Sequence, residues 1–123
     1  MVDTKLTWPE PRGGTSFSGA YLQTPWSFAE TVARLIALSG QDPTQFTDEY
    51  KVSVEFGGTF DGQVFTLYDY KGDDTLHVGA LDGRLDVAGL NAYLIDALTA
   101  VQPSPFTALI QYDDDRRRYG WPE

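Results

Sequence analysis

The sequence predicts an α+β fold, in which two helices pack on one face of an antiparallel sheet of three to four strands. Apolar residues recur at the helical spacing of three or four within residues 28–36 and again within residues 90–101. Between these segments, from Tyr50 onward, apolar and polar residues alternate as they do in a strand with one buried face. Since two such helices cover three or four strands on one side only, we expect the other sheet face to be open.

The chain of 123 residues is long enough for a single domain with one core. Residues 1–24 are dense in proline, glycine and serine and predict an N-terminal arm with at most short extended pieces. Residues 25–112 form the predicted α+β core, and residues 113–123 a charged tail. Within the core, residues 106–112 alternate weakly and are a candidate fourth strand at the sheet edge.

The first helix has two candidate N-terminal caps, and Gly40 supplies its left-handed stop. Thr24 as the cap would place Pro25 at the first helical position, where the missing N–H costs nothing. Ser27 as the cap would place Glu30 three residues on, as in a capping box. The predicted buried stripe of this helix comprises Phe28, Val32, Leu35 and Ile36.

A second helix is predicted to start at Asp86, which can act as its N-terminal cap. Its buried stripe comprises Leu90, Leu94, Leu98 and Val101. Pro103 and Pro105 cannot continue a helix, so the helix ends before them.

Asp61 and Gly62 predict a two-residue hairpin turn, which sets the register of the two strands that flank it. The pairs implied are Phe56 with Leu67, Gly58 with Phe65, Glu55 with Tyr68, and Ser53 with Tyr70. This register gathers apolar side chains on one face and polar ones on the other. Asp69 is the exception, because it falls opposite Val54 on the apolar face. Either a bulge ends the pairing near residue 68, or this carboxylate is buried and hydrogen-bonded.

The open sheet face is the candidate binding site. A turn at residues 71–74 leads to a third strand at residues 75–80, which places His77 on the same face as the two hairpin tyrosines. Tyrosine offers a large contact area at a small entropic cost, so such a face suits a partner protein or a stacked base. The candidate binding residues are Lys51, Glu55, Tyr68, Tyr70 and His77.

The net charge of −9 argues against two classes of partner. Nucleic acids and anionic membrane surfaces both attract cations, so we expect neither direct nucleic-acid binding nor membrane binding. Acidic loops could instead mimic phosphates in the groove of a DNA-binding protein, or serve solubility alone. The acidic residues in question are Asp42, Asp48, Glu49, Asp73 and Asp74, with Asp82 and Asp86 nearby in sequence.

The absence of cysteine and the presence of one histidine limit the chemistry further. No disulfide or thiolate nucleophile can form, and no metal site is expected. His77 with Glu55 or Asp69 could form a general-base dyad, but no nucleophile motif accompanies it, so we expect no catalytic residue and no enzyme. No glycine-rich cofactor motif occurs, and no cofactor is expected. Without an apolar leader or a run of about 20 apolar residues, we expect a cytoplasmic protein.

Three segments of the chain together form a distinctive pattern. They are Tyr-Lys-Val-Ser-Val-Glu-Phe at residues 50–56, Thr-Leu-Tyr-Asp-Tyr-Lys at residues 66–71, and Leu-His-Val-Gly-Ala at residues 76–80. Across about residues 27–100, this pattern resembles a family of small uncharacterised accessory proteins of tailed bacteriophages. Leu76 stands where the family usually has tryptophan, and the segment between Lys71 and His77 is shorter than in the family. The resemblance implies no activity, but phage proteins of this size often bind and disable host factors.

The leading hypothesis is therefore a non-enzymatic phage accessory protein that acts in the host cytosol and inhibits a host or defence protein by binding it. One alternative is a sponge for a nucleotide-type defence signal, in which the tyrosines stack the base and Lys51, Arg34 or Arg84 offsets the phosphate charge. Another alternative is a structural module that forms a homo-oligomer through the open face.

Overall fold

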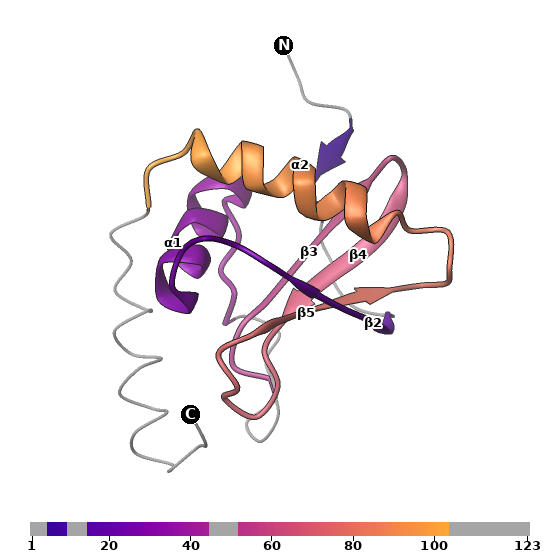
Figure 1. Ribbon diagram of the computed structural model, residues 1–123, viewed down its shortest axis with the longest axis horizontal. Helices are drawn as coiled ribbons and strands as arrows, with labels where there is room; N and C mark the ends of the chain where they lie inside the picture. Colours follow the sequence, from indigo (N-terminus) through magenta and orange to yellow (C-terminus); the bar gives the residue numbers. More distant parts are fainter. Residues whose placement is uncertain (1–4, 10–14, 45–51, 104–123) are drawn as a thin grey trace.

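The computed structural model describes residues 5–9, 15–44 and 52–103. In this part of the chain five antiparallel strands form one sheet, and two helices lie against it (Figure 1). Side chains from both helices meet those of one sheet face in a single hydrophobic core. The predicted α+β class is confirmed, and the sheet has five strands where three to four were expected.

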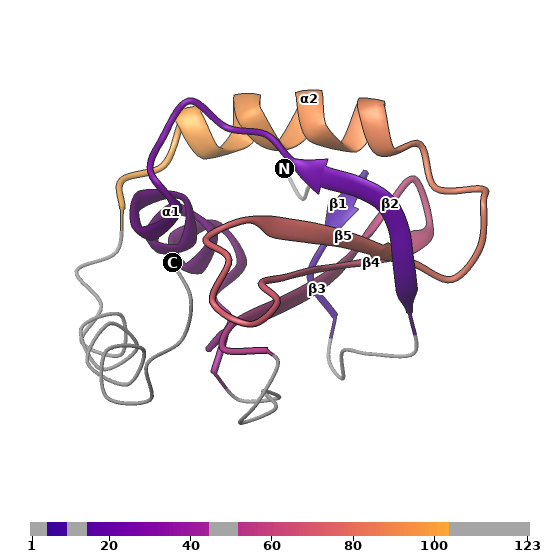
Figure 2. The ribbon, with the colours of Figure 1, turned by 60° about the horizontal axis from the view of Figure 1, so that its bottom comes forward.

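The strands are β1 (Leu6–Thr7), β2 (Ser16–Leu22), β3 (Glu55–Phe60), β4 (Gln63–Tyr68) and β5 (Leu76–Ala80). Their order across the sheet is β1-β3-β4-β5-β2. The two strands that come first in the chain therefore form the two outer edges, and Figure 2 shows β2 lying along β5.

The N-terminal segment that was predicted to be an arm contributes these two edge strands, which corrects that prediction. All seven residues of β2 belong to it. The register against β5 shifts between Phe17 and Ala20, where Gly19 has a positive φ of 91°. The serine and glycine that suggested an irregular arm thus lie in a β-bulge, with paired residues on both sides of it. The candidate strand at residues 106–112 and the predicted tail lie outside the described residues.

Helix α1 (Phe28–Ser39) begins at Ser27, the second of the two candidate caps. The Ser27 hydroxyl accepts a hydrogen bond from the Glu30 N–H at 3.1 Å. Gly40 ends the helix with a φ of 72°, as predicted. Helix α2 (Val87–Thr99) is capped by Asp86, also as predicted, but it ends before Val101. The fully buried members of the two predicted stripes are Val32, Leu35, Leu90, Leu94 and Leu98.

The hairpin register predicted from Asp61 and Gly62 is confirmed from the Phe60–Gln63 pair to the Glu55–Tyr68 pair. Both turn residues have positive φ, 50° and 78°, which is the backbone that a tight two-residue hairpin turn requires. The predicted pairing of Ser53 with Tyr70 is wrong, because regular pairing stops at Glu55 and Tyr68.

The β3 edge beyond the short strand β1 is covered by the loop that follows α1. The buried side-chain amide of Gln41 donates to the Gly57 carbonyl at 2.8 Å and accepts from the Gly57 N–H at 3.1 Å. Two residues earlier in β3, the Glu55 N–H donates to the Pro43 carbonyl at 2.7 Å. This loop therefore takes the place of a neighbouring strand along half of β3.

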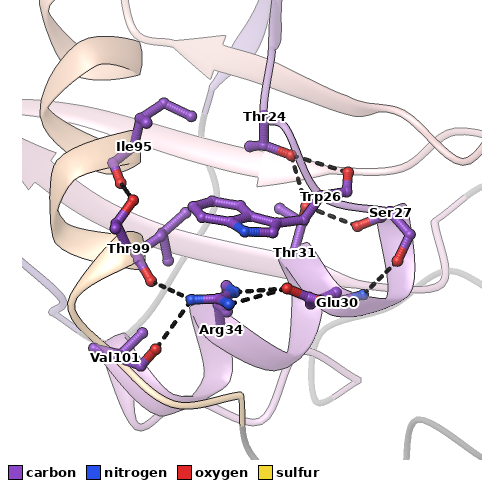
Figure 3. A network of polar contacts seen from close by, with 10 residues as sticks. Thr24, Trp26, Ser27, Glu30, Thr31, Arg34, Ile95, Thr99 and Val101 are labelled. Atoms are coloured by element: carbon purple, nitrogen blue, oxygen red, sulfur yellow. Dashed lines mark hydrogen bonds and ion pairs between the residues drawn. The ribbon is translucent and has the colours of Figure 1, made fainter.

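Arg34 joins the two helices at the end of α2 (Figure 3). Its guanidinium donates to the carbonyl of Leu98 in the last turn of α2 at 2.9 Å and to that of Val101, just after the helix, at 3.1 Å. The same group pairs with Glu30 at 3.0 Å and stacks 4.4 Å from the centre of the Trp26 ring. One cation thus fixes the position of α1 relative to α2.

We expect Arg34→Met to lower the free energy of unfolding by about 2 kcal/mol, because two carbonyl bonds to a charged donor and the ring contact are lost. Urea unfolding followed by circular dichroism measures the change. Arg84→Met is the matched control, since Arg84 is exposed and pairs with its near neighbour Asp82. Equal unfolding midpoints for the Arg34 and Arg84 variants would contradict the role given to Arg34.

Candidate functional site

One row of paired residues crosses four strands on the sheet face that the helices leave uncovered. Glu55 on β3 pairs with Tyr68 on β4, and Tyr68 pairs with His77 on β5. His77 in turn pairs with Tyr21 on β2. The structure thus brings together three of the five predicted binding residues in one row, with a fourth, Tyr70, close by. Lys51 lies outside the described residues.

Aromatic rings surround His77 in this row. Tyr68 stacks on the imidazole, with ring centres 5.3 Å apart and an interplanar angle of 17°. Tyr21 and Phe17 meet the imidazole edge-on at 4.9 and 5.1 Å, and Tyr70 lies at 6.1 Å. We call this group, Phe17, Tyr21, Tyr68, Tyr70 and His77, the aromatic face.

The aromatic face is exposed at its rim and closed at its centre. Phe17, Tyr21 and Tyr70 are 47%, 44% and 40% exposed, whereas the His77 side chain is only 12% exposed. Tyrosine and phenylalanine side chains with this much apolar surface in water, arranged around one ordered centre, are typical of contact surfaces. The arrangement therefore suits binding through the rim.

Asp73 holds the centre of the aromatic face. One carboxylate oxygen lies 2.7 Å from Nε2 of His77. The other oxygen accepts the N–H groups of Tyr70 and Thr75, each at 3.2 Å. Asp73 thus fixes both the imidazole and the turn between β4 and β5. The partner of the imidazole is Asp73 rather than the Glu55 or Asp69 considered from sequence.

The predicted acidic residues do not share one environment. Asp42 accepts hydrogen bonds from the N–H and hydroxyl of Thr44 in the loop after α1. Asp73 belongs to the aromatic face, and Asp74 lies beside it with a positive φ of 57°. Asp48 and Glu49 lie outside the described residues. Asp73 is therefore exposed but held by hydrogen bonds to Tyr70, Thr75 and His77, which neither phosphate mimicry nor solubility requires.

Asp69 resolves the ambiguity at the end of the hairpin in favour of the second alternative, a buried and hydrogen-bonded carboxylate. Regular pairing ends at Tyr68, and Asp69 is completely buried. Its carboxylate accepts the N–H of Ser53 at 2.7 Å and the N–H of Val54 at 3.1 Å. The carboxylate therefore takes the place of a strand partner for two buried N–H groups and anchors the chain between Tyr68 and Tyr70.

Phe17 and Tyr21 are the residues of the aromatic face that sequence reasoning missed as site residues. Both lie in the segment predicted to be an arm, because the bulge at residues 18 and 19 hides the strand. The signal in the sequence was two aromatic residues four positions apart, shortly before the predicted first helix. Their pairing with β5, about sixty residues away, could not be read from local sequence.

A hollow of about 390 Å³ lies beside the aromatic face, where β2, the end of β5 and the start of α2 come together. Phe17 belongs to both the hollow and the aromatic face. Leu81, at 58% exposure, is the most exposed large apolar side chain among the described residues. Other residues that line the hollow are Ser16, Ala80, Asp82, Leu85 and Val87.

Within residues 5–9, 15–44 and 52–103, no group of three or more histidine, cysteine or acidic side chains is placed to hold a metal ion. Neither of the two described helices is long and apolar enough to cross a membrane.

Comparison of the chain with models of known protein families, with curated proteins and with solved structures finds no match. The resemblance to phage accessory proteins therefore stays a hypothesis, and the function has to be inferred from the aromatic face and its surroundings.

The pKa of the Tyr68 hydroxyl depends on its burial and on its neighbours in the row. Burial raises the pKa of Tyr68 above the usual tyrosine value of about 10, and the negative charge of Glu55 raises it further. The pKa of Tyr68 is higher in the folded than in the unfolded protein, so folding favours the neutral hydroxyl. The contribution of this hydroxyl to the free energy of unfolding is therefore fully present below about pH 10 and is lost as the pH rises through the raised pKa.

We expect Glu55→Gln to lower the pKa of Tyr68 toward the usual value, because the nearby charge is removed. Phenolate absorbance titrations of the wild type and the variant, each compared with the same protein carrying Tyr68→Phe, isolate this group from the other six tyrosines. An unchanged titration would show that Glu55 and Tyr68 are not neighbours.

We expect Asp69→Ala to lower the free energy of unfolding by roughly 2–4 kcal/mol, because two buried N–H groups lose their acceptor. Asp69→Asn is the matched control, since its amide oxygen can still accept from Ser53 and Val54, and we expect a smaller loss. Urea unfolding measures both values. Equal losses in the two variants would mean that the charge, and not hydrogen-bond acceptance, is what the site needs.

Proposed function

We propose that this protein acts by binding another protein, without catalysis, and that the aromatic face is the contact surface. The observation that carries the proposal is the arrangement of Phe17, Tyr21 and Tyr70. These rings stay 40–47% exposed around a nearly buried histidine, while the core on the other side of the sheet is closed.

The rim rings are held in place before any partner arrives. Each contacts the His77 ring, and His77 is fixed by Asp73. Binding through rings that are already ordered loses little side-chain entropy, and tyrosine is common among the residues that dominate binding energy at protein interfaces. The aromatic face therefore has the properties of a preorganised contact surface.

The charge of the surroundings supports a basic partner. Glu55 lies in the row, and Asp73 and Asp74 lie in the adjoining turn. With a net charge of −9, the protein would attract a basic protein surface over a distance and associate with it quickly at low salt. Host and defence proteins that handle nucleic acids present such surfaces. The proposed role is a phage accessory protein of the host cytosol that inhibits one of them by occupying its basic surface.

A nucleotide-type small molecule is the second candidate, and Lys71 favours it. Its ammonium group lies 5.4 Å from the centre of the Tyr70 ring, where it could pair with a phosphate. The stacking of Tyr68 on His77 is evidence for the first candidate, because the space in which a base would lie between these two rings is filled.

The test is an affinity purification from host cytosol, followed by measurement of the dissociation constant for the protein that is captured. We expect Tyr70→Ala to weaken binding at least tenfold, because it removes an exposed ring but leaves the core intact. Asp96→Ala, an exposed change on α2, is the control and should bind like the wild type.

Three results would contradict the proposal. The first is equal affinity of the wild type and Tyr70→Ala for the captured protein. The second is a retained molecule of a few hundred daltons in native mass spectrometry, which would favour the nucleotide sponge. The third is a symmetric homodimer that Tyr68→Lys dissociates, which would identify the aromatic face as a self-association surface.

A further inference from the structure

We infer that the partner adds an extended segment to the sheet along the outer edge of β2, so that it contacts the aromatic face from the side. This inference rests on the proposed function, since it specifies how the partner binds. We call the outer side of residues 16–21 the open edge. Three features of the open edge support the inference: its free position in the sheet, its composition, and the two binding surfaces that flank it.

The two ends of the sheet are closed to different extents. On the β3 side, β1, the Gln41 amide and the Pro43 carbonyl bond to the edge. On the β2 side, the Asn91 amide of α2 accepts from the Gln23 N–H at 2.7 Å and donates to the Gln23 carbonyl at 3.3 Å. Among the described residues, no strand pairs with β2 on the side away from β5.

The backbone of Tyr21 points toward this open side. Along a strand, the direction of the N–H and C=O groups alternates from residue to residue. Asn91 bonds both backbone groups of Gln23 from outside the sheet, so those groups point away from β5. Two residues earlier, the N–H and C=O of Tyr21 point the same way, to the side where no described strand pairs with β2.

The composition of β2 does not protect the edge in the usual ways. The strand Ser-Phe-Ser-Gly-Ala-Tyr-Leu contains no charged residue and no proline, although edge strands commonly carry one or the other to prevent pairing. Its bulge is retained by Ser18, whose hydroxyl donates to the Val78 carbonyl at 2.7 Å. A bulge discourages long, flat sheet-to-sheet pairing, so the open edge suits a short segment that is read by its side chains.

The open edge runs between two different binding surfaces. On one side lie the rings of Phe17 and Tyr21, and on the other lies the hollow, which Phe17 also lines together with Ala80, Leu85 and Val87. Side chains of an added strand point alternately to the two sides. When an extended peptide is added to a sheet in this way, backbone bonds give affinity and alternate side chains give specificity. An apolar side chain fits the hollow, and an arginine fits the exposed rings.

Charge selects a separate, basic protein segment over a second copy of this chain. Two copies would each bring a net charge of −9, whereas a cationic segment is attracted by the same charge. Asp73 adds an exposed carboxylate at the aromatic face, whereas Asp82 at the hollow is paired with Arg84. The inferred occupant is therefore a short extended segment that alternates arginine or lysine with apolar residues.

The test uses the full chain and a defined probe, the acetylated and amidated heptapeptide Arg-Leu-Arg-Leu-Arg-Leu-Arg. We expect the peptide to shift the amide resonances of β2 and to slow hydrogen exchange at Tyr21. A version of the peptide with every residue N-methylated has the same charge but cannot donate a strand bond in any register, and we expect it to bind at least tenfold more weakly.

A pair of variants separates the backbone from the side chain. Tyr21→Pro and Tyr21→Ala both remove the ring, but only proline also removes the outward N–H. We expect Tyr21→Pro to bind the peptide at least fivefold more weakly than Tyr21→Ala, with both proteins checked for unchanged circular dichroism. Should Tyr21→Pro fail to fold, the N-methylated peptide on the wild type still decides the question.

The inference is overturned if both peptides bind equally, if resonance shifts are confined to Tyr68 and Tyr70, or if a homodimer protects the Tyr21 amide without peptide. Equal peptide binding leaves the proposed function standing, provided that Tyr70→Ala still weakens the captured partner. If the open edge binds the peptide as expected but Tyr70→Ala leaves the partner unaffected, the proposed function fails by itself.

Discussion

The register of the β3–β4 hairpin is the constraint on which the rest of the structure depends. Asp61 and Gly62 fix it, because both adopt the positive φ that a two-residue turn requires. A shift by one residue would move Phe56 and Leu67 from the core to the open face and bring Tyr68 inside. The turn therefore determines which face the helices cover and which face carries the tyrosines. The same register carries over to β5, because Tyr68 pairs with His77, and through His77 it reaches Tyr21.

The two faces of the sheet then serve opposite purposes. On one face α1 and α2 close the core, and Arg34 fixes their relative position. Both helices are on that side, so side chains of the other face find their contacts within that face. Aromatic rings pack against His77, and His77 is hydrogen-bonded to Asp73. His77, whose side chain is 12% exposed at the centre of four rings, serves mainly to hold these rings in place. The aromatic face is thus ordered by the same contacts that leave its rim exposed.

The parts that could be predicted from the sequence depend on contacts between near neighbours in the chain. The caps Ser27 and Asp86, and the hairpin from Glu55 to Tyr68, follow from residues a few positions apart. Strand β2 could not be found in this way, because it pairs with β5 about sixty residues away and its bulge interrupts the alternation. As a result, the predicted site contained Tyr68, Tyr70 and His77 but lacked the two rings from β2. The partner of His77 was also missed, because Asp73 reaches it only through the shape of the turn.

Two amide side chains bond backbone groups at the two outer sides of the sheet. Gln41 and Asn91 each bond both backbone groups of one residue, Gly57 at one edge and Gln23 at the other. Such amides replace a missing strand at a single position, so the length of edge that stays open depends on where they are placed. Asn91 lies at the end of β2, and next to Phe17 and Tyr21 no strand of the described part of the chain pairs with the outer side of β2. This stretch thus coincides with the part of the edge that has rings on one side and a hollow on the other. A segment added along this stretch, as we infer, would therefore meet the rings and the hollow at the same time.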